Sequence, residues 1–240
     1  MIMTSHQILN PADHGSLRIL ADVGAEWGDG VMSCLAVPAE FRRLACEYPI
    51  LFYHDSEARA FSAIALFGFE PGENLFVENG KWEATCRPFA MAVQPFLVGR
   101  SRDGKGASQV HVDLGHSKIA TGGEGIRVFD DGGQPTPYLD EVARMLGALD
   151  ESYQASGEFF AALDRYDLLE PFSMDVKLDS AGSHRLVGYH LINEDRLRAL
   201  DSSLLAELHA AGHLEPIYMA LASLGNLGKL VRRKNRRANA

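Results

Sequence analysis

Two histidines and an aspartate lie close together in the stretch HVDLGH, at His111, Asp113 and His116. A non-haem iron site needs two neutral imidazoles and a carboxylate on one face of the metal, with positions left open for oxygen and a co-substrate. Residues two apart on a strand share a face, so His111 and Asp113 have the geometry that two of these ligands require. The third ligand would be His190, which lies in the later stretch LVGYHLI.

This set predicts an Fe(II)-dependent oxygenase of the 2-oxoglutarate type or another metal-dependent modifying enzyme. In the oxygenase, Arg196 or Arg198 would bind the carboxylate of the co-substrate. The competing interpretation is an edge strand with outward polar residues, closed by Gly115. A His-X-Asp pattern is short enough to occur often by chance, and we therefore favour the edge strand. We expect no cofactor, with Fe(II) as the alternative.

No other pattern in the sequence carries an assignable chemistry. His209 and His213 are four apart, which would suit a metal on one continuous helix, but a glycine between them is expected to end that helix. The three cysteines have no CxxC spacing, and only Cys86 has an adjacent cation, Arg87. A GxSxG nucleophile, a GxGxxG fingerprint and a Walker loop are all missing. We therefore assign no catalytic residue.

Composition places the chain among ordinary globular proteins, with 240 residues of which 46% are hydrophobic and 23% charged. Six basic and no acidic residues follow from Lys229 onward, so the preceding chain has a formal charge of −15. An acidic body argues against nucleic-acid binding. The N-terminus lacks a secretory pattern, and the apolar stretch 88–99 is too short to span a bilayer. We expect a cytoplasmic protein, with envelope association as a further possibility.

Strand patterns dominate the first half of the sequence and helix patterns the second, which predicts an α+β fold. We expect an antiparallel sheet built from hairpins, with a helical C-terminal half packed on it. Asn79-Gly80 predicts a type I′ turn in the first hairpin. Two helices are expected between Pro137 and Pro171, and Asn193 and Asp201 are expected to cap later ones.

The expected domain organisation is a polar lead-in over 1–30, a single domain over 31–230 and a solvated basic tail over 231–240. A lobe boundary within the single domain would fall near 99–133, because that stretch is rich in glycine.

Four blocks, taken in order, resemble the SapC family of bacterial proteins associated with surface layers. They are EFRRLACEYPILF, LFGFEPGENLFVENGKWEATCRPFAMAVQPF, VFDDGGQPTPYLDEV and LVGYHLINEDRLRALDSSLLAELHAAGHLEPIYMALASLGNL. The resemblance implies a role linked to the bacterial surface layer or envelope. It also implies a genetic neighbourhood with halogenase-like proteins, cupin-like hydroxylases and outer-membrane receptors. It supplies no catalytic residue set.

The second block is dense in aromatic residues and predicts a contact surface for a polypeptide partner. Trp82 and Arg87 are of the residue types that dominate interface energies, and Phe69 and Asn74 belong to the same block. We therefore expect a non-enzymatic accessory protein of surface-layer or envelope biogenesis that presents a protein substrate to a modifying enzyme. The expected partner is a surface-layer, receptor or halogenase/hydroxylase-type protein, and no nucleic acid.

Overall fold

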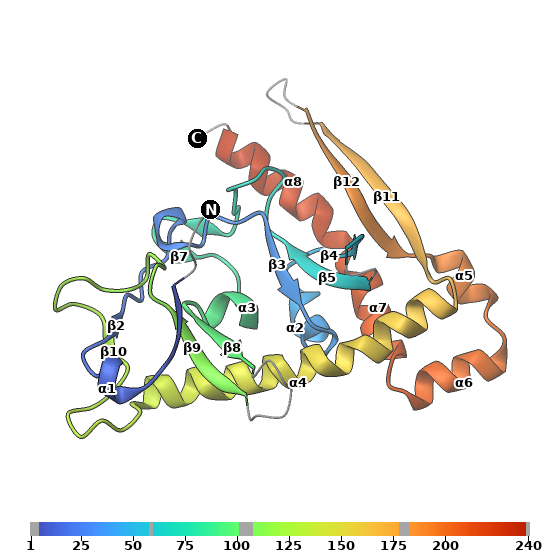
Figure 1. Cartoon of the computed structure of the whole chain (residues 1–240). Helices are drawn as coiled ribbons and strands as arrows, with labels where there is room; N and C mark the ends of the chain where they lie inside the picture. Colours follow the sequence, from blue (N-terminus) through green and yellow to red (C-terminus); the bar gives the residue numbers. More distant parts are fainter. Residues whose placement is uncertain (1–4, 58–59, 101–107, 178–182, 239–240) are drawn as a thin grey trace. The chain divides into compact units, whose positions relative to one another are not determined.

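A computed structural model describes residues 5–57, 60–100, 108–177 and 183–238 of the chain (Figure 1). The chain forms two compact units that interleave in sequence. Unit 1 comprises Met1–Gly30, Val77–Trp82 and Phe89–Glu151, and unit 2 comprises Val31–Phe76, Glu83–Pro88 and Ser152–Ala240. The glycine-rich stretch 99–133, where we expected a boundary, lies inside unit 1. The two units therefore do not meet at a single point in the sequence.

Unit 1 is built around a three-stranded antiparallel sheet with the order β1-β9-β8. Its strands are β1 (His6–Ile8), β9 (Gln109–Asp113) and β8 (Phe96–Gly99). Two short antiparallel pairs accompany it. They are β2 (Arg18–Ile19) with β10 (Ile126–Arg127), and β6 (Val77–Glu78) with β7 (Lys81–Trp82). The short helices of this unit are α1 (Pro11–His14), a 3-10 turn (Ala25–Trp27) and α3 (Phe89–Ala92).

The core of unit 1 corrects our expectation of a loose lead-in over 1–30. Ile19 from that segment is buried in one apolar cluster with Phe96, Val112 and Leu146. Strand β1 also pairs with β9, so that Gln7 lies opposite Val112. Local composition was polar, but pairing with a strand about a hundred residues later supplies the apolar neighbours that order the segment.

A buried ion pair anchors the end of this N-terminal segment. Lys118 Nζ lies 3.3 Å from Asp29 Oδ2, with side-chain exposures of 4% and 0%. The ammonium group also donates to the carbonyl of Asp22 over 2.7 Å, and the carboxylate accepts from the amide of Gly24 over 3.2 Å. Buried charges are stable only when such partners compensate their lost hydration.

Unit 2 contains a five-stranded antiparallel sheet with the order β11-β12-β4-β5-β3. The strands are β3 (Ser33–Ala36), β4 (Ile50–Asp55), β5 (Ala60–Leu66), β11 (Leu169–Lys177) and β12 (Ser183–Ile192). Strand β12 pairs with β4 only through Tyr189 and His190. The β11–β12 hairpin therefore continues past the sheet as a two-stranded ribbon over residues 183–187, beyond a bulge at which Gly188 has φ +84°.

The helices of unit 2 follow the local signals in the sequence. They are a 3-10 turn (Pro38–Glu40), α2 (Phe41–Leu44), α5 (Glu194–Ala199), α6 (Ser202–Ala210), α7 (Leu214–Ser223) and α8 (Gly225–Ala238). The predicted caps of α5 and α6 are confirmed, because the side chains of Asn193 and Asp201 accept hydrogen bonds from amides of the first turns. No described helix is long and apolar enough to cross a membrane.

Helix α4 (Pro137–Arg165) is one helix of 29 residues where we expected two. Gly147 and Gly157 do not interrupt it, and a Cβ at either position would meet no neighbour. In unit 2 its second half packs Phe159 and Phe160 against Phe41 and Phe52, with ring centroids 6.1 and 6.4 Å apart. This burial compensates the helix for the glycines, each of which costs roughly 1 kcal/mol relative to alanine.

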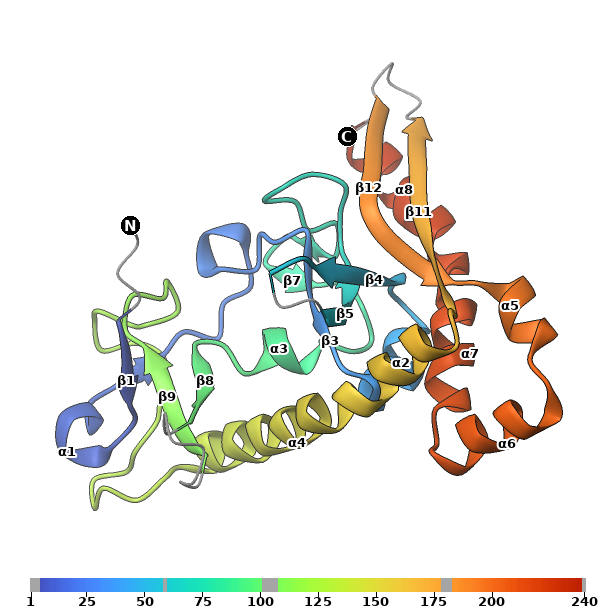
Figure 2. The ribbon, with the colours of Figure 1, turned by 45° about the vertical axis from the view of Figure 1, so that its right-hand side comes forward.

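The prediction of a solvated basic tail over 231–240 also needs correction, because α8 continues through Ala238. Figures 1 and 2 show α8 running alongside the β11–β12 hairpin, within unit 2. Leu230 of this helix is 1% exposed. The class itself is confirmed: the fold is α+β, with antiparallel sheets and a helical C-terminal half.

Candidate functional site

The hairpin that carries Trp82 has the predicted turn. Asn79 and Gly80 have φ of 50° and 71°, as a type I′ turn requires, and Val77 lies opposite Trp82 in the register. Trp82 is half-buried, so part of its indole surface is accessible. The indole could therefore contribute to a contact with another protein, although it also interacts within the chain.

Arg87 is half-buried at the end of the same sequence block. Its carbonyl accepts a hydrogen bond of 3.0 Å from Arg43 Nη2, and Arg43 also pairs with the buried Glu40 over 2.5 Å. Tyr48 donates to the neighbouring carbonyl of Cys86 over 2.5 Å. This part of the block is thus held by its backbone, and Arg87 Nε is itself buried.

Phe69 and Asn74, the other two residues of the predicted contact surface, are buried, with 5% and 4% exposure. The Asn74 side chain accepts from the amide of Phe76 over 2.9 Å, and the amide of Phe69 donates to Glu73 over 2.9 Å. Both residues therefore shape the loop between β5 and β6. Their burial leaves Trp82 and Arg87 as the residues of this prediction that have accessible surface.

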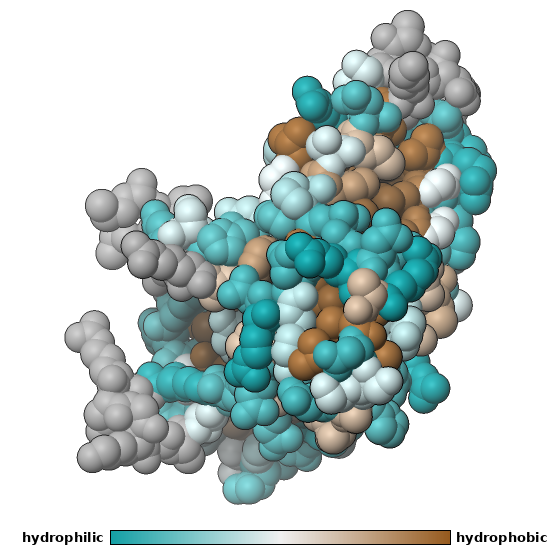
Figure 3. Space-filling model, turned by 90° about the vertical axis from the view of Figure 1, so that its right-hand side faces the viewer, coloured by the Kyte–Doolittle hydropathy of each residue, from teal (hydrophilic) through white to brown (hydrophobic). Residues whose placement is uncertain are grey.

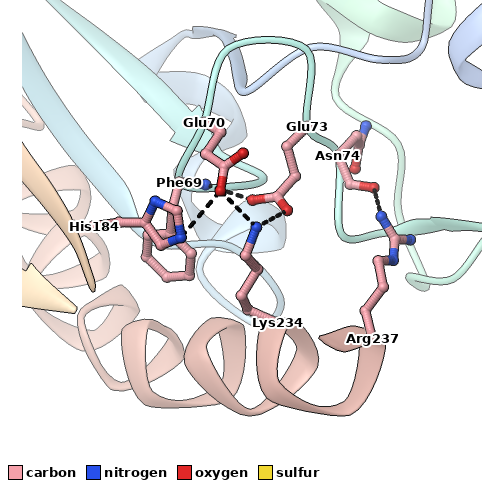
Figure 4. A network of polar contacts seen from close by, with 7 residues as sticks. All are labelled: Phe69, Glu70, Glu73, Asn74, His184, Lys234 and Arg237. Carbon is pink, nitrogen blue, oxygen red and sulfur yellow. Dashed lines mark hydrogen bonds and ion pairs between the residues drawn. The ribbon is translucent and has the colours of Figure 1, made fainter. Parts of the chain in front are cut away.

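The same loop is tied to α8 by a polar cluster that we call the Lys234 network, made of Glu70, Glu73, His184 and Lys234 (Figure 4). Lys234 Nζ donates to Glu70 Oε1 over 2.9 Å and to Glu73 Oε1 over 2.6 Å. His184 Nε2, on β12, lies 3.0 Å from the same oxygen of Glu70. One ammonium group thus joins two carboxylates of the loop and, through Glu70, the protruding hairpin.

The charges in this network are mutually stabilised. The hydrogen bond from Lys234 lowers the pKa of Glu70 below its ordinary value of 4.5. Burial lowers the pKa of Lys234, but its hydrogen bonds to Glu73 and Glu70 outweigh burial and raise that pKa above 10.5. Both groups are therefore charged at neutral pH, and neither is prepared to exchange a proton in catalysis.

Two further basic residues of α8 face the same loop. Arg237 Nη1 donates to the carbonyl of Asn74 over 3.1 Å (Figure 4). The Arg233 guanidinium lies 4.5 Å from the centroid of the Phe76 ring and donates to the carbonyl of Glu83 over 3.0 Å. Three of the five basic residues in the segment 231–240, which we expected to be solvated, therefore make structural contacts.

The protruding hairpin presents apolar side chains to solvent. Val187 is 56% exposed, and Phe172 and Met174 are partly exposed on the adjacent strand. Apolar residues gather along this hairpin in the upper part of Figure 3. The exposure arises because the hairpin extends past β4, which no periodicity reveals.

Most of the chain matches one known family. The sequence profile of the SapC family matches residues 9–230. The chain belongs to the SapC family. The matched range includes the loop with Glu70 and Glu73 and the hairpin with His184, whereas Lys234 lies beyond it. No curated protein and no solved structure matches this SapC-family chain.

The residues of the iron hypothesis occupy different units. His111 and Asp113 lie on β9 in unit 1, and His190 lies on β12 in unit 2. Asp113 Oδ2 is 3.8 Å from His6 Nε2, and a Cβ at Gly99 would lie 1.9 Å from His111 Nε2, so His111 packs directly over that glycine. Within the described ranges, no three His, Cys, Asp or Glu side chains are grouped so that they could hold a metal ion.

His190 has an aromatic environment instead of a ligand set. Its ring centroid lies 5.1 Å from that of Phe61, and the Phe61 ring also contacts His54 at 4.8 Å. Burial, with a smaller contribution from His54, lowers the pKa of His190. The arginines proposed for a co-substrate are paired nearby: Arg196 with Asp167, and Arg198 with Glu194.

The remaining chemical candidates have structural environments. Burial raises the pKa of the Cys86 thiol, which donates to the carbonyl of Arg43 over 3.4 Å, so this cysteine is not an activated nucleophile. Gly212 has φ +73° and ends α6, as predicted, and His213 lies past the helix that carries His209. The two histidines therefore do not share one helical face.

Proposed function

We propose that this protein is a non-enzymatic, protein-binding accessory of bacterial surface-layer or envelope biogenesis. Its partner would be a surface-layer protein, a receptor, or a halogenase- or hydroxylase-type enzyme to which it presents a protein substrate. Family membership supports the link to the surface layer, and the observation that supports protein binding is the exposed β11–β12 hairpin with Val187 at its bulge.

A two-stranded ribbon with exposed apolar side chains is suited to binding a polypeptide. Large exposed apolar surface on a folded protein commonly marks an interaction site. Strand β11 is at the edge of its sheet, so its outer backbone groups face no other described strand. An extended segment of a partner can add to such an edge through main-chain hydrogen bonds, with neighbouring side chains providing selectivity.

Contacts of β12 close to the turn of the hairpin hold the ribbon in place, which favours binding. His184 is joined through Glu70 to Lys234, and Leu186 is 1% exposed beside it. A pre-ordered ribbon loses less conformational entropy when a partner binds than a flexible one does. Trp82 in unit 1 and Arg87 in unit 2 remain two further proposed contact residues, since each retains accessible surface.

Site-specific photo-crosslinking in the native bacterium tests this proposal. A photoreactive phenylalanine analogue would replace Val187 in one strain and Trp82 in another, and crosslinked proteins would be identified by mass spectrometry. Tyr153 on α4 provides the matched control, because it is 53% exposed and lies away from the hairpin in sequence.

The expected result is a crosslink from position 187 to a surface-layer, receptor or modifying protein that is missing at position 153. The Val187→Asp variant should lose binding to the purified partner while keeping its circular dichroism spectrum. Crosslinks no more frequent at 187 and 82 than at 153 would overturn the proposal. So would a partner that binds Val187→Asp and Trp82→Ala as tightly as the unmodified protein.

A further inference from the structure

A pocket of about 340 Å³ opens in unit 2 where the C-terminal end of α4 meets α6 and the start of α7. Figures 1 and 2 both show these three helices close together. The volume is at the lower end of the range for sites that bind small molecules or single side chains. The pocket shares no residue with the hairpin or with the Trp82 and Arg87 segment.

The polar lining of the pocket is dominated by hydrogen-bond acceptors. Glu158 and Glu207 contribute two carboxylates, and no ion pair or hydrogen bond joins Glu158 to another described residue. Tyr166 donates its hydroxyl hydrogen to Glu207 Oε2 over 2.6 Å, and the Arg165 side chain lies within hydrogen-bonding range of the Tyr166 hydroxyl. The two carboxylates favour a ligand that donates hydrogen bonds and carries positive charge.

Two basic side chains also line the pocket, but neither removes its preference for a positively charged ligand. The Arg165 guanidinium lies 5.9 Å from the centroid of the Tyr166 ring, where the aromatic face interacts with it. His213 is partly buried, with its ring 5.6 Å from that of Phe159, and burial lowers its pKa. The imidazole is thus neutral at pH 7, and the carboxylates outnumber the single remaining cation.

The imidazole of His213 also has unused hydrogen-bonding capacity, because its buried Nδ1 has no hydrogen-bond partner among the described residues. Small and apolar side chains form the rest of the lining: Ala161, Ala162, Leu208 and Ala211. Leu208 and Ala162 are buried, whereas Ala161 and Ala211 are exposed. An apolar stem can pack on such a wall while its charged end reaches the carboxylates at the rim.

We propose that this pocket binds an alkylammonium or guanidinium group carried on an apolar stem, the chemistry of a lysine or arginine side chain. The formal charge of −15 over the first 228 residues would further attract such a cation. A polypeptide as the source of the side chain rests on the proposed function above. The preference for a cation does not, because a free diamine carries the same group.

Titrations of the full chain followed by amide chemical shifts test this proposal. The probes are N-acetyl-lysine N-methylamide, the corresponding norleucine and glutamate compounds, cadaverine, and a glycine-serine heptapeptide with one central lysine. The lysine compound should shift amides of residues 158–166 and 207–213 saturably, and the norleucine and glutamate compounds should not. If the heptapeptide binds more tightly than the lysine compound, the ligand is a side chain of a polypeptide. If cadaverine binds as tightly as the lysine compound, the ligand is a free amine.

Three variants make the test specific. Glu158→Gln should weaken lysine binding by about tenfold, the effect of one hydrogen bond to a charged group. Ala161→Leu should abolish binding by filling the pocket. Asp164→Asn removes the same charge from the same helix outside the pocket, and should change the affinity by less than about twofold.

The proposal is overturned if no probe binds, or if the norleucine or glutamate compound binds as tightly as the lysine compound. It is also overturned if Glu158→Gln and Ala161→Leu retain full affinity while folded. A partner that still crosslinks at Val187 when lysine does not bind would leave the proposed function standing without the pocket. Lysine binding without any crosslink would support the pocket and count against the proposed function.

Discussion

Lys234 Nζ lies 2.6 Å from Glu73 Oε1, and the two side chains are only 14% and 12% exposed. The residues are 161 positions apart in the sequence, so this contact fastens the C-terminal helix α8 to the loop between β5 and β6. Its low exposure distinguishes it from most ion pairs on protein surfaces, which contribute little to stability.

Replacing Lys234 by methionine should therefore lower the free energy of unfolding by about 1–3 kcal/mol, since Glu73 would keep its burial without its partner. The equally basic but exposed Lys229, which has no partner among the described residues, provides the control, and Lys229→Met should change stability by less than about 0.5 kcal/mol. Urea denaturation measures both. Equal effects of the two substitutions would contradict a structural role for the network.

The stability that Glu70 provides should depend on pH in a defined direction. Its pKa is lowered in the folded state by the hydrogen bond from Lys234, so its contribution is present above the ordinary value of 4.5 and is lost as pH falls through the lower folded value. The difference in unfolding free energy between the unmodified protein and Glu70→Gln should shrink as pH falls below about 4.5. A difference that grows below this pH would have the wrong sign for the contact with Lys234.

Breaking the ion pair between Asp29 and Lys118 should lower the free energy of unfolding more than breaking an ion pair on the surface. Lys118→Met leaves a carboxylate that is 0% exposed without its cation, and we expect a loss of about 3–5 kcal/mol. Arg42→Met removes one partner of an exposed pair with Glu215, and should cost less than about 1 kcal/mol. Chemical denaturation of the two variants tests this order, and a loss in Lys118→Met as small as that in Arg42→Met would show that the pair is hydrated in solution.

Elemental analysis of protein purified without chelators tests the iron hypothesis. We expect iron and zinc well below one equivalent per chain, because no three His, Cys, Asp or Glu side chains among the described residues are grouped so that they could hold a metal ion. His111→Ala should then leave the metal content unchanged. Stoichiometric iron that disappears in His111→Ala would instead favour an oxygenase.

Much of the fold could be predicted because its signals are local. Asn79-Gly80 specifies its turn through backbone conformation, and Asn193 and Asp201 cap helices through hydrogen bonds within one turn. The prediction of two helices in place of α4 was wrong because contacts between distant elements decide the continuity of this helix. Glycine weakens a helix locally, but aromatic packing of Phe159 and Phe160 in unit 2 outweighs that cost.

The candidate sites were less accessible to sequence reasoning. His111 and Asp113 do share a strand, but nothing in the sequence indicates that His111 packs on Gly99 or that Asp113 faces His6. Phe69 and Asn74 looked like contact residues because aromatic and amide side chains suit interfaces, and their burial became evident only in the fold. The pocket beside Tyr166 has no sequence pattern at all, since its lining comes from separate helices.

By itself, the sequence determined the α+β class, the turns and caps, the acidic body and the resemblance to the SapC family. These depend on residue types, on spacing along one element, or on the order of blocks, all of which are written in the chain. Only the tertiary structure decided that basic residues near the C-terminus face the loop with Glu70 and Glu73, and that Glu158 and Glu207 line one pocket. Such relationships join residues about 50 to 160 positions apart, and their partners are selected by the packing of whole elements against one another.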